Sequence, residues 1–194
     1  AMPVATASAE TTVLILDGSA SMAARLGDGT RLDAAKAALH AMLDTTVKAA
    51  PDHGIALISF YDGCWVDVMT RPAPIGKSLK TVREKVDGIA TRQYGHTPIA
   101  RSLERAADVL NGEPGHIVLV SDGQESCEED RDLCALARTL AARNVDFEVI
   151  LVGLAMSKEQ KEAVRCIPEE TGGAFLVADD VEGLKEALGF AAER

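Results

Sequence analysis

Five oxygen-bearing side chains form the most distinctive chemical pattern in this sequence. Asp17, Ser19 and Ser21 alternate in one short segment, Thr97 precedes a proline, and Asp122 lies between a serine and a glycine. Carboxylates and hydroxyls are hard ligands that suit Mg²⁺ or Mn²⁺ better than zinc or copper. Because Mg²⁺ prefers about six oxygen ligands, these residues would leave at least one position for an outside ligand. The pattern predicts a Mg²⁺ or Mn²⁺ site with an open position.

Both aspartates follow short apolar runs that have the pattern of buried strands. Residues 12–16 and 116–120 are dominated by Val, Ile and Leu, as is typical of strands covered on both faces of a parallel sheet. In open α/β sheets, ligands bind beyond the carboxyl ends of the strands, where the strand order reverses. We therefore expect both aspartates at the edge of this crevice.

Amphipathic segments with apolar residues at three- and four-residue steps alternate with the apolar runs, which predicts helices between strands. We expect further strands at 55–61, 65–70, 145–152 and 174–177, and helices at 31–49, 78–86, 98–110, 130–143, 157–168 and 180–192. Asp62-Gly63 suits a tight hairpin turn before the antiparallel strand 65–70, and Asp130 suits a helix cap. The fold class predicted is α/β: a doubly wound, mostly parallel six-stranded sheet with one antiparallel edge strand and helices on both faces.

The composition fits one domain and narrows the range of partners. The chain has 194 residues, of which 47% are hydrophobic and 26% charged, an ordinary balance for a globular domain. Twenty Lys and Arg against 30 Asp and Glu give a net charge of −10, which argues against nucleic acid as a partner. No apolar run approaches the ~20 residues that span a bilayer, so we expect no membrane insertion. Residues 1–10 are expected to be a flexible tail and 11–194 the domain.

The four cysteines leave two interpretations open. Cys64, Cys127, Cys134 and Cys166 contain no Cys-x-x-Cys pair and no zinc-type spacing with histidine. On one continuous helix, Cys127 and Cys134 would lie ~10 Å apart, beyond the reach of a disulfide, so they can pair only if Cys127 precedes the helix. The spacing is compatible with two disulfides in an oxidising compartment and equally with four buried thiols.

Three segments carry a motif in a fixed order: Asp17–Met22, Thr97 and Ser121–Gly123. In order and spacing they resemble the metal-ion-dependent adhesion site of the von Willebrand factor type A domain family, and the resemblance extends from about residue 11 to residue 192. One departure is that Gly18 precedes Ser19, where many relatives have the glycine between the two serines. Both serines remain, so the departure concerns the flexibility of the loop.

The segments around the cysteines, 121–127, 134–137 and 166–173, resemble bacterial members of this family more specifically. Many of these bacterial proteins are exported. The resemblance therefore favours disulfides and a periplasmic or extracellular location, with a cytoplasmic location as the alternative.

The resemblance implies a non-enzymatic protein-interaction module. It implies that Ser19 and Ser21 coordinate the ion directly, that Thr97 does so directly or through water, and that Asp17 and Asp122 act mainly through water or by holding the serines. With neutral oxygens around it, the ion stays electrophilic and binds an Asp or Glu carboxylate from a partner protein. An acidic surface would repel such a partner without the ion, so a chelator should abolish binding.

Two other functions remain open. One is a Mg²⁺-dependent phosphohydrolase with Asp17 as nucleophile, although a phosphatase of the aspartyl-phosphate type would carry a second aspartate where this chain has Ser19. The sequence also lacks a Gly-x-x-x-x-Gly-Lys phosphate loop and a Gly-x-Ser-x-Gly elbow. The other is a regulatory subunit of an ATPase partner, as some intracellular relatives are.

A few further residues are candidates for the rim of the binding face. Asp62, Glu125 and the segment 94–96 lie close to the motif residues in the predicted fold, with turn residues or solvated side chains as the alternative reading. We expect Trp65 to pack on the edge strand.

Overall fold

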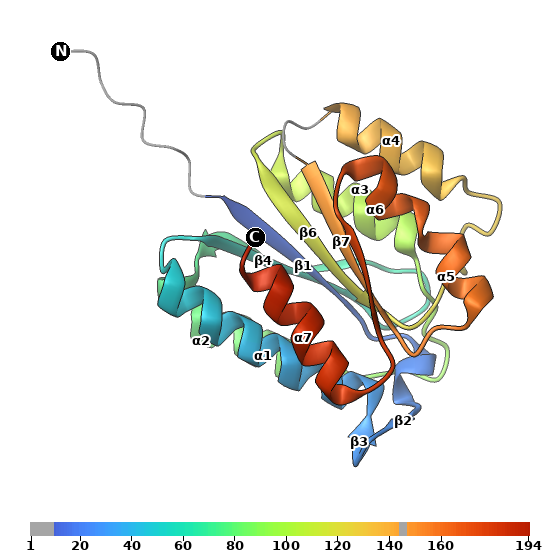
Figure 1. The fold of residues 1–194 in the computed structure, drawn as a ribbon, viewed down its shortest axis with the longest axis horizontal. Helices are drawn as coiled ribbons and strands as arrows, with labels where there is room; N and C mark the ends of the chain where they lie inside the picture. The colour runs from blue at the N-terminus through green and yellow to red at the C-terminus, as the bar shows by residue number, and fades with distance from the viewer. Residues whose placement is uncertain (1–9, 144–146) are drawn as a thin grey trace.

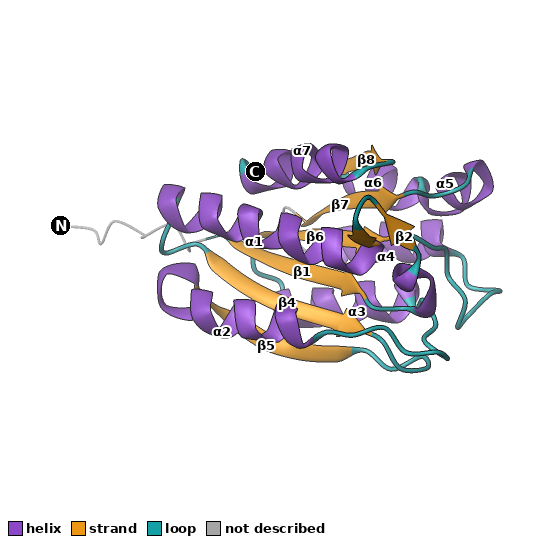
Figure 2. Cartoon of the chain, turned by 90° about the horizontal axis from the view of Figure 1, so that it is seen from below, coloured by secondary structure: helices purple, strands orange, loops and turns teal. Residues whose placement is uncertain are grey.

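The chain folds into a central β-sheet between two sets of helices, as Figure 1 and Figure 2 show. This computed structural model describes residues 10–143 and 147–194. The first nine residues of the predicted tail, and the first two of the strand predicted at 145–152, lie outside the described residues.

The sheet has six strands in the order β5-β4-β1-β6-β7-β8. The strands are β1 (Thr11–Asp17), β4 (Gly54–Phe60), β5 (Asp67–Pro74), β6 (Gly115–Ser121), β7 (Phe147–Leu154) and β8 (Ala174–Ala178). All neighbouring pairs are parallel except β4 and β5, which are antiparallel. The predicted fold class is confirmed, including its single antiparallel edge strand.

The helices cover both faces of this sheet and enclose a separate apolar core on each. One core includes residues of α1 (Arg31–Ala49), α2 (Ile75–Gly88) and α7 (Val181–Ala192). The other includes residues of α3 (Ile99–Leu110), α4 (Leu133–Arg143), α5 (Lys158–Val164) and α6 (Cys166–Thr171). In β1, Leu14 and Leu16 belong to the first core and Val13 and Ile15 to the second. Because both faces are buried, the strand needs a continuous apolar run.

The strand order places the switch point of the sheet between β1 and β6. From β1 the chain moves to β4 on one side, whereas β6 lies on the other side of β1 and leads to β7. The loops that follow β1 and β6 therefore diverge and leave a crevice at their carboxyl ends. The first loop contains a short 3₁₀ turn, η1 (Ala20–Ala23), and a small hairpin that was not predicted, β2 (Arg25–Leu26) with β3 (Gly29–Thr30). The hairpin projects at the bottom of Figure 1.

Trp65 and the start of the edge strand were predicted wrongly. Residues 61–66 separate β4 from β5, so the connection is longer than a tight hairpin turn at Asp62-Gly63. Trp65 lies in this loop and is 79% exposed, so it does not pack on the edge strand. The alternating pattern that starts at Trp65 is followed by β5 only from Asp67 onward.

Two helix starts and the length of a third helix also differ from prediction. Asp132, not Asp130, caps α4: its Oδ1 accepts a hydrogen bond of 2.9 Å from the amide of Ala135. Pro98 precedes α3 instead of being its first residue. The helix predicted at 157–168 is two helices, α5 and α6, although Ser157 caps the first of them as predicted.

The four cysteines form two disulfides, Cys64–Cys127 and Cys134–Cys166, with Cα–Cα distances of 5.8 and 5.4 Å. Cys127 precedes α4 and pairs with the loop after β4, while Cys134 lies in α4 and pairs with α6. The structure thereby resolves the choice that the cysteine spacing left open.

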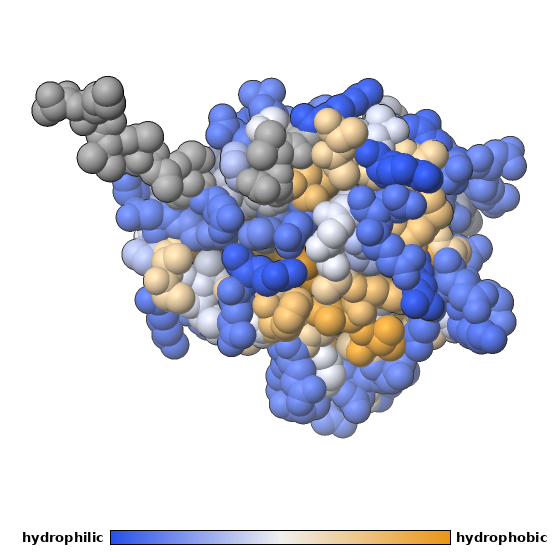
Figure 3. Space-filling view, turned by 45° about the horizontal axis from the view of Figure 1, so that its top comes forward, coloured by the Kyte–Doolittle hydropathy of each residue, from blue (hydrophilic) through white to orange (hydrophobic). Residues whose placement is uncertain are grey.

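Figure 3 shows one face of the molecule, on which hydrophilic residues surround a hydrophobic area. Large exposed hydrophobic side chains within the described part of the chain are Trp65, Tyr94, Val177 and Phe190. None of the helices that the structure describes has the length and apolar character needed to cross a membrane.

Candidate metal centre

Asp17 joins the loop after β1 to the end of β6. It is the last residue of β1 and is fully buried. Its Oδ1 accepts a hydrogen bond of 2.7 Å from the amide of Ser19, and its Oδ2 accepts one of 2.5 Å from the hydroxyl of Ser121. The hydrogen bond from Gly18 N to the carbonyl of Phe60 (2.8 Å) fixes the same loop to the end of β4. Asp17 therefore acts as a structural anchor at the switch point.

Asp122 makes the corresponding link from the β6 side. Its Oδ1 accepts a hydrogen bond of 2.6 Å from the Ser21 hydroxyl, and its Oδ2 accepts one of 2.7 Å from Arg31. The hydroxyls of Ser19 and Ser21 are 3.1 Å apart. Asp17, Ser19, Ser21 and Asp122 thus form one connected network, although Ser21 and Asp122 are 101 residues apart in sequence.

Thr97 approaches the same edge from the loop before α3. A Cβ atom on Gly123 would lie 3.3 Å from Thr97 Oγ1, and one on Gly95 would lie 3.1 Å from Ser19 Cα. The amide of Ala20 also donates to the carbonyl of Gly95 (3.2 Å). Among the described residues, no hydrogen bond joins the Thr97 hydroxyl to the other four predicted residues. The structure brings all five to one edge of the sheet and links four of them directly.

The electrostatics of this edge are unbalanced. Burial, followed by the negative charge of Asp122, raises the pKa of Asp17 to about 6, against the lowering effect of its hydrogen bonds from Ser121 and Ser19. Arg31 is the partner of Asp122, but no ion pair to Asp17 occurs among the described residues. Two buried carboxylates beside one guanidinium and three hydroxyls form a set of hard donors with excess negative charge, which fits a divalent cation such as Mg²⁺.

The hydroxyls are essential to this interpretation. In the described part of the chain, no three His, Cys, Asp or Glu side chains are grouped so that they could hold a metal ion. A cation at this edge would therefore depend on Ser19, Ser21 and Thr97.

Several residues that shape the site were assigned no ligand role from the sequence. Arg31 binds Asp122, Ser121 binds Asp17, and Gln160 Nε2 donates to the carbonyl of Asp122 (3.3 Å). No local signal identifies Arg31 or Gln160, because these contacts join distant parts of the chain. The role of Ser121 could have been predicted, because it lies within the motif, directly before Asp122.

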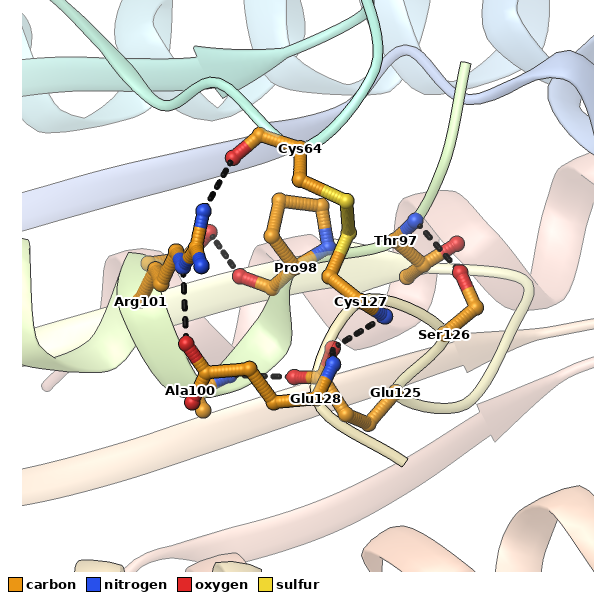
Figure 4. Close-up of a disulfide and its surroundings, with 10 residues drawn as sticks. Cys64, Thr97, Pro98, Ala100, Arg101, Glu125, Ser126, Cys127 and Glu128 are labelled. Carbon is orange, nitrogen blue, oxygen red and sulfur yellow. Dashed lines mark hydrogen bonds and ion pairs between the residues drawn. A yellow bond between two sulfur atoms is a disulfide. The ribbon is translucent and has the colours of Figure 1, made fainter. Parts of the chain in front are cut away.

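Of the predicted rim residues, Glu125 has another role. Its carboxylate accepts hydrogen bonds from the amides of Ala100, Cys127 and Glu128 at 2.7, 2.7 and 3.0 Å (Figure 4). It therefore braces the loop after β6 against the start of α3. Asp62 and Tyr94 are exposed, as a rim requires.

Comparison with known proteins places this chain in a family. The model of the von Willebrand factor type A domain matches residues 12–124. No curated protein sequence matches the chain.

Similar solved structures include a von Willebrand factor type A protein from Catenulispora acidiphila, with a TM-score of 0.77, 21% identity, and coverage of 95% of this chain and 42% of that one. The PilB minor pilin from Streptococcus sanguinis has a TM-score of 0.77 and 13% identity, and the match covers 99% of this chain and 62% of the pilin. The pilus adhesin SpaC from Lactobacillus rhamnosus GG has a TM-score of 0.78 and 14% identity, and the match covers 95% of this chain and 30% of the adhesin. This chain thus spans less than two thirds of each of these proteins. From its matched residues and its fold, the chain belongs to the von Willebrand factor type A domain family.

Proposed function

We propose that this protein is a metal-dependent interaction module that binds an Asp or Glu carboxylate of a partner protein through Mg²⁺ or Mn²⁺. One observation carries the proposal: two buried carboxylates, Asp17 and Asp122, lie with three hydroxyls at the switch point of the sheet, and in the described part of the chain Arg31 is the only basic side chain that pairs with either of them. A divalent ion would balance this charge.

Each residue would have a distinct role in holding the ion. The Ser21 hydroxyl donates a hydrogen bond to Asp122, so Ser19 is the donor in its contact with Ser21 and one lone pair of Ser21 remains available for a cation. Ser19 is held next to it through the contact of its amide with Asp17. The ion would supply an electrophilic position for a carboxylate, and Ser21, which is exposed, would lie on the side that a partner approaches.

Two exposed aromatic side chains support a protein as the partner. Trp65 and Tyr94 are 79% and 75% exposed, and their loops are joined by a bridge between Gly63 and Gly95. Gly95 in turn contacts the loop of Ser19. Aromatic residues contribute strongly to protein interfaces, so these two are suited to contact the residues around a bound carboxylate.

The alternative functions have less support. Asp17 is fully buried and both of its carboxylate oxygens already accept hydrogen bonds, which argues against a nucleophile that attacks a phosphoester. Two disulfides are typical of proteins in oxidising compartments. They favour a periplasmic or extracellular protein over a cytoplasmic regulatory subunit of an ATPase.

The proposal is tested by capture of partners from the source organism. The immobilised chain should retain a protein in Mg²⁺ that EDTA releases, and Ser19→Ala and Asp122→Ala should fail to retain it. Asp52→Ala is the matched control, because it removes an exposed carboxylate just before β4, at the opposite end of the sheet. Capture of the same protein with EDTA and with both variants would contradict the metal bridge. Hydrolysis of a generic phosphoester that Asp17→Asn abolishes would favour the phosphohydrolase instead.

A further inference from the structure

Thr97 differs from the other four candidate ligands in how it is held. Asp17 and Asp122 lie at strand ends and bind the two serines or their loop through hydrogen bonds within the network. Thr97 precedes α3, is 6% exposed, and has no hydroxyl contact to that network within the described residues. Its position must therefore be set by other parts of the chain.

One support for Thr97 comes from the loop after β6. The amide of Thr97 donates to the hydroxyl of Ser126 (2.9 Å), and the amide of Ser126 donates to the carbonyl of Thr97 (3.2 Å). Glu125 holds the same loop to the amide of Ala100 in the first turn of α3. The segment from Thr97 to Ala100 is thus attached at both ends to residues 125–126.

The second support comes from the loop after β4. The amide of His96 donates to the carbonyl of Gly63 (3.2 Å), and Gly63 also forms a bridge with Gly95. Residues 95–97 therefore lie between the loop of Gly63 and the loop of Ser126.

The Cys64–Cys127 disulfide joins these two supports directly. Cys64 follows Gly63 and Cys127 follows Ser126, so the bond lies next to both contacts with residues 96 and 97, as Figure 4 shows for the Ser126 side. Arg101 spans the same link, since its Nε donates to Glu128 (2.8 Å) and its guanidinium donates to the carbonyl of Cys64 (3.4 Å). By contrast, Cys134–Cys166 joins α4 to α6, and neither helix contributes a candidate ligand.

We propose that the Cys64–Cys127 disulfide, together with Ser126, is a clamp that positions Thr97 for the bound cation. This inference rests on the proposed function. Without the bond, the two loops separate more easily and the Thr97 hydroxyl loses its fixed place at the edge of the sheet. The cation then binds more weakly although the fold persists. Residues that orient metal ligands typically contribute about 10- to 100-fold to metal affinity.

The test compares matched removals of the two disulfides in the full chain. The variant Cys64→Ser/Cys127→Ser should bind Mn²⁺ about 10-fold more weakly than the unmodified chain, as measured by the electron paramagnetic resonance signal of free Mn²⁺. The variant Cys134→Ser/Cys166→Ser should keep the original affinity. Equal affinity in both double variants, each shown to be folded by circular dichroism, would overturn the clamp.

A second pair of variants leaves both disulfides in place and guards against a failure to fold. Ser126→Ala removes the acceptor of the Thr97 amide and should weaken Mn²⁺ binding, whereas Ser126→Thr keeps a hydroxyl and should restore it. An unchanged affinity in Ser126→Ala would also overturn the proposal.

Hydrogen exchange of the Thr97 amide, followed by NMR, reads out the clamp without any metal. Exchange should be faster in Cys64→Ser/Cys127→Ser and in Ser126→Ala, and unchanged in Cys134→Ser/Cys166→Ser. If the unmodified chain binds no Mn²⁺ while this exchange pattern holds, the proposed function fails and the positioning of Thr97 stands. If exchange is the same in all variants, the positioning itself is wrong.

Discussion

The ionisable groups at the two ends of the β-sheet differ in their exposure to water and in their basic partners. At the amino ends of the strands, His116 lies 3.7 Å from both Glu10 and Glu148, and Arg194 lies 3.5 Å from Glu148. These glutamates are partly exposed, with 50% and 31% of their side chains accessible.

At the carboxyl ends, Asp17 and Asp122 are buried and Arg31 pairs with only one of them. Charge at the amino end can be balanced by water and by the basic groups of the chain. At the carboxyl end both carboxylates are buried, and among the described residues Asp17 has no basic partner, so an added cation should affect this end alone.

The largest expected effect is on cation affinity, which substitutions at the carboxyl end of the sheet should lower and substitutions at the amino end should not. Ser19→Ala removes a proposed direct ligand, and Asp122→Asn removes a negative charge and one of the two acceptor oxygens that bind Ser21 and Arg31. Each should weaken Mn²⁺ binding by roughly 100-fold, measured by isothermal titration calorimetry. Glu148→Gln removes a carboxylate at the amino end and should leave the affinity unchanged. A loss of binding in Glu148→Gln equal to that in Asp122→Asn would remove the distinction between the ends.

The second-largest expected effect is that acid lowers the affinity of the site for Mn²⁺. The pKa of Asp17 is raised from 3.8 to about 6 by burial and by the charge of Asp122. Because protonated Asp17 no longer contributes negative charge, Mn²⁺ affinity should fall by up to about tenfold per pH unit below about pH 6. Asp17→Asn should bind Mn²⁺ weakly at every pH. An affinity that stays constant between pH 7 and pH 5 would contradict the role of this carboxylate.

The raised pKa of Asp17 should also make the stability of the metal-free chain depend on pH. Since folding raises the pKa of Asp17, its charged form favours the unfolded state, and the free energy of unfolding should decrease as the pH rises from about 4 to about 6. The full change from this residue is on the order of 3 kcal/mol. Denaturant unfolding in EDTA at pH 4 and pH 7, with Asp17→Asn as the control, measures this contribution.

The smallest expected effect lies at the amino end and has the opposite sign. Burial lowers the pKa of His53, which hydrogen-bonds Thr12 at 2.8 Å. Protonation of His53 therefore favours the unfolded state, and its contribution to stability is lost as the pH falls below about 6.5. His53→Gln should be less sensitive to acid in this range, with unchanged Mn²⁺ affinity. If the acid sensitivity of unfolding is the same in His53→Gln, this assignment is wrong.

The sequence was most informative where burial alone determines the pattern. The runs in β1 and β6 read as buried strands because both of their faces lie in apolar cores. Asp17 and Asp122 could be located at one edge because the carboxyl ends of neighbouring parallel strands must meet.

The contacts that hold the site residues in place could not be predicted from the sequence, because they join distant parts of the chain. Arg31 reaches Asp122 across 91 residues and Ser121 reaches Asp17 across 104, and such contacts exist only after the chain has folded. The disulfide pairing was open for the same reason. Trp65 was misassigned because an alternating pattern describes an edge strand and an adjoining exposed loop equally well.

The central claim is that a divalent cation binds between the loops that follow β1 and β6. The most direct measurement is the anomalous diffraction from a crystal of the chain soaked in Mn²⁺. We predict a peak within coordination distance, about 2.2 Å, of the hydroxyls of Ser19 and Ser21, with the Thr97 hydroxyl on the same ion directly or through one water. A fully soaked crystal with Mn²⁺ bound elsewhere on the protein and none at these serines would contradict the account.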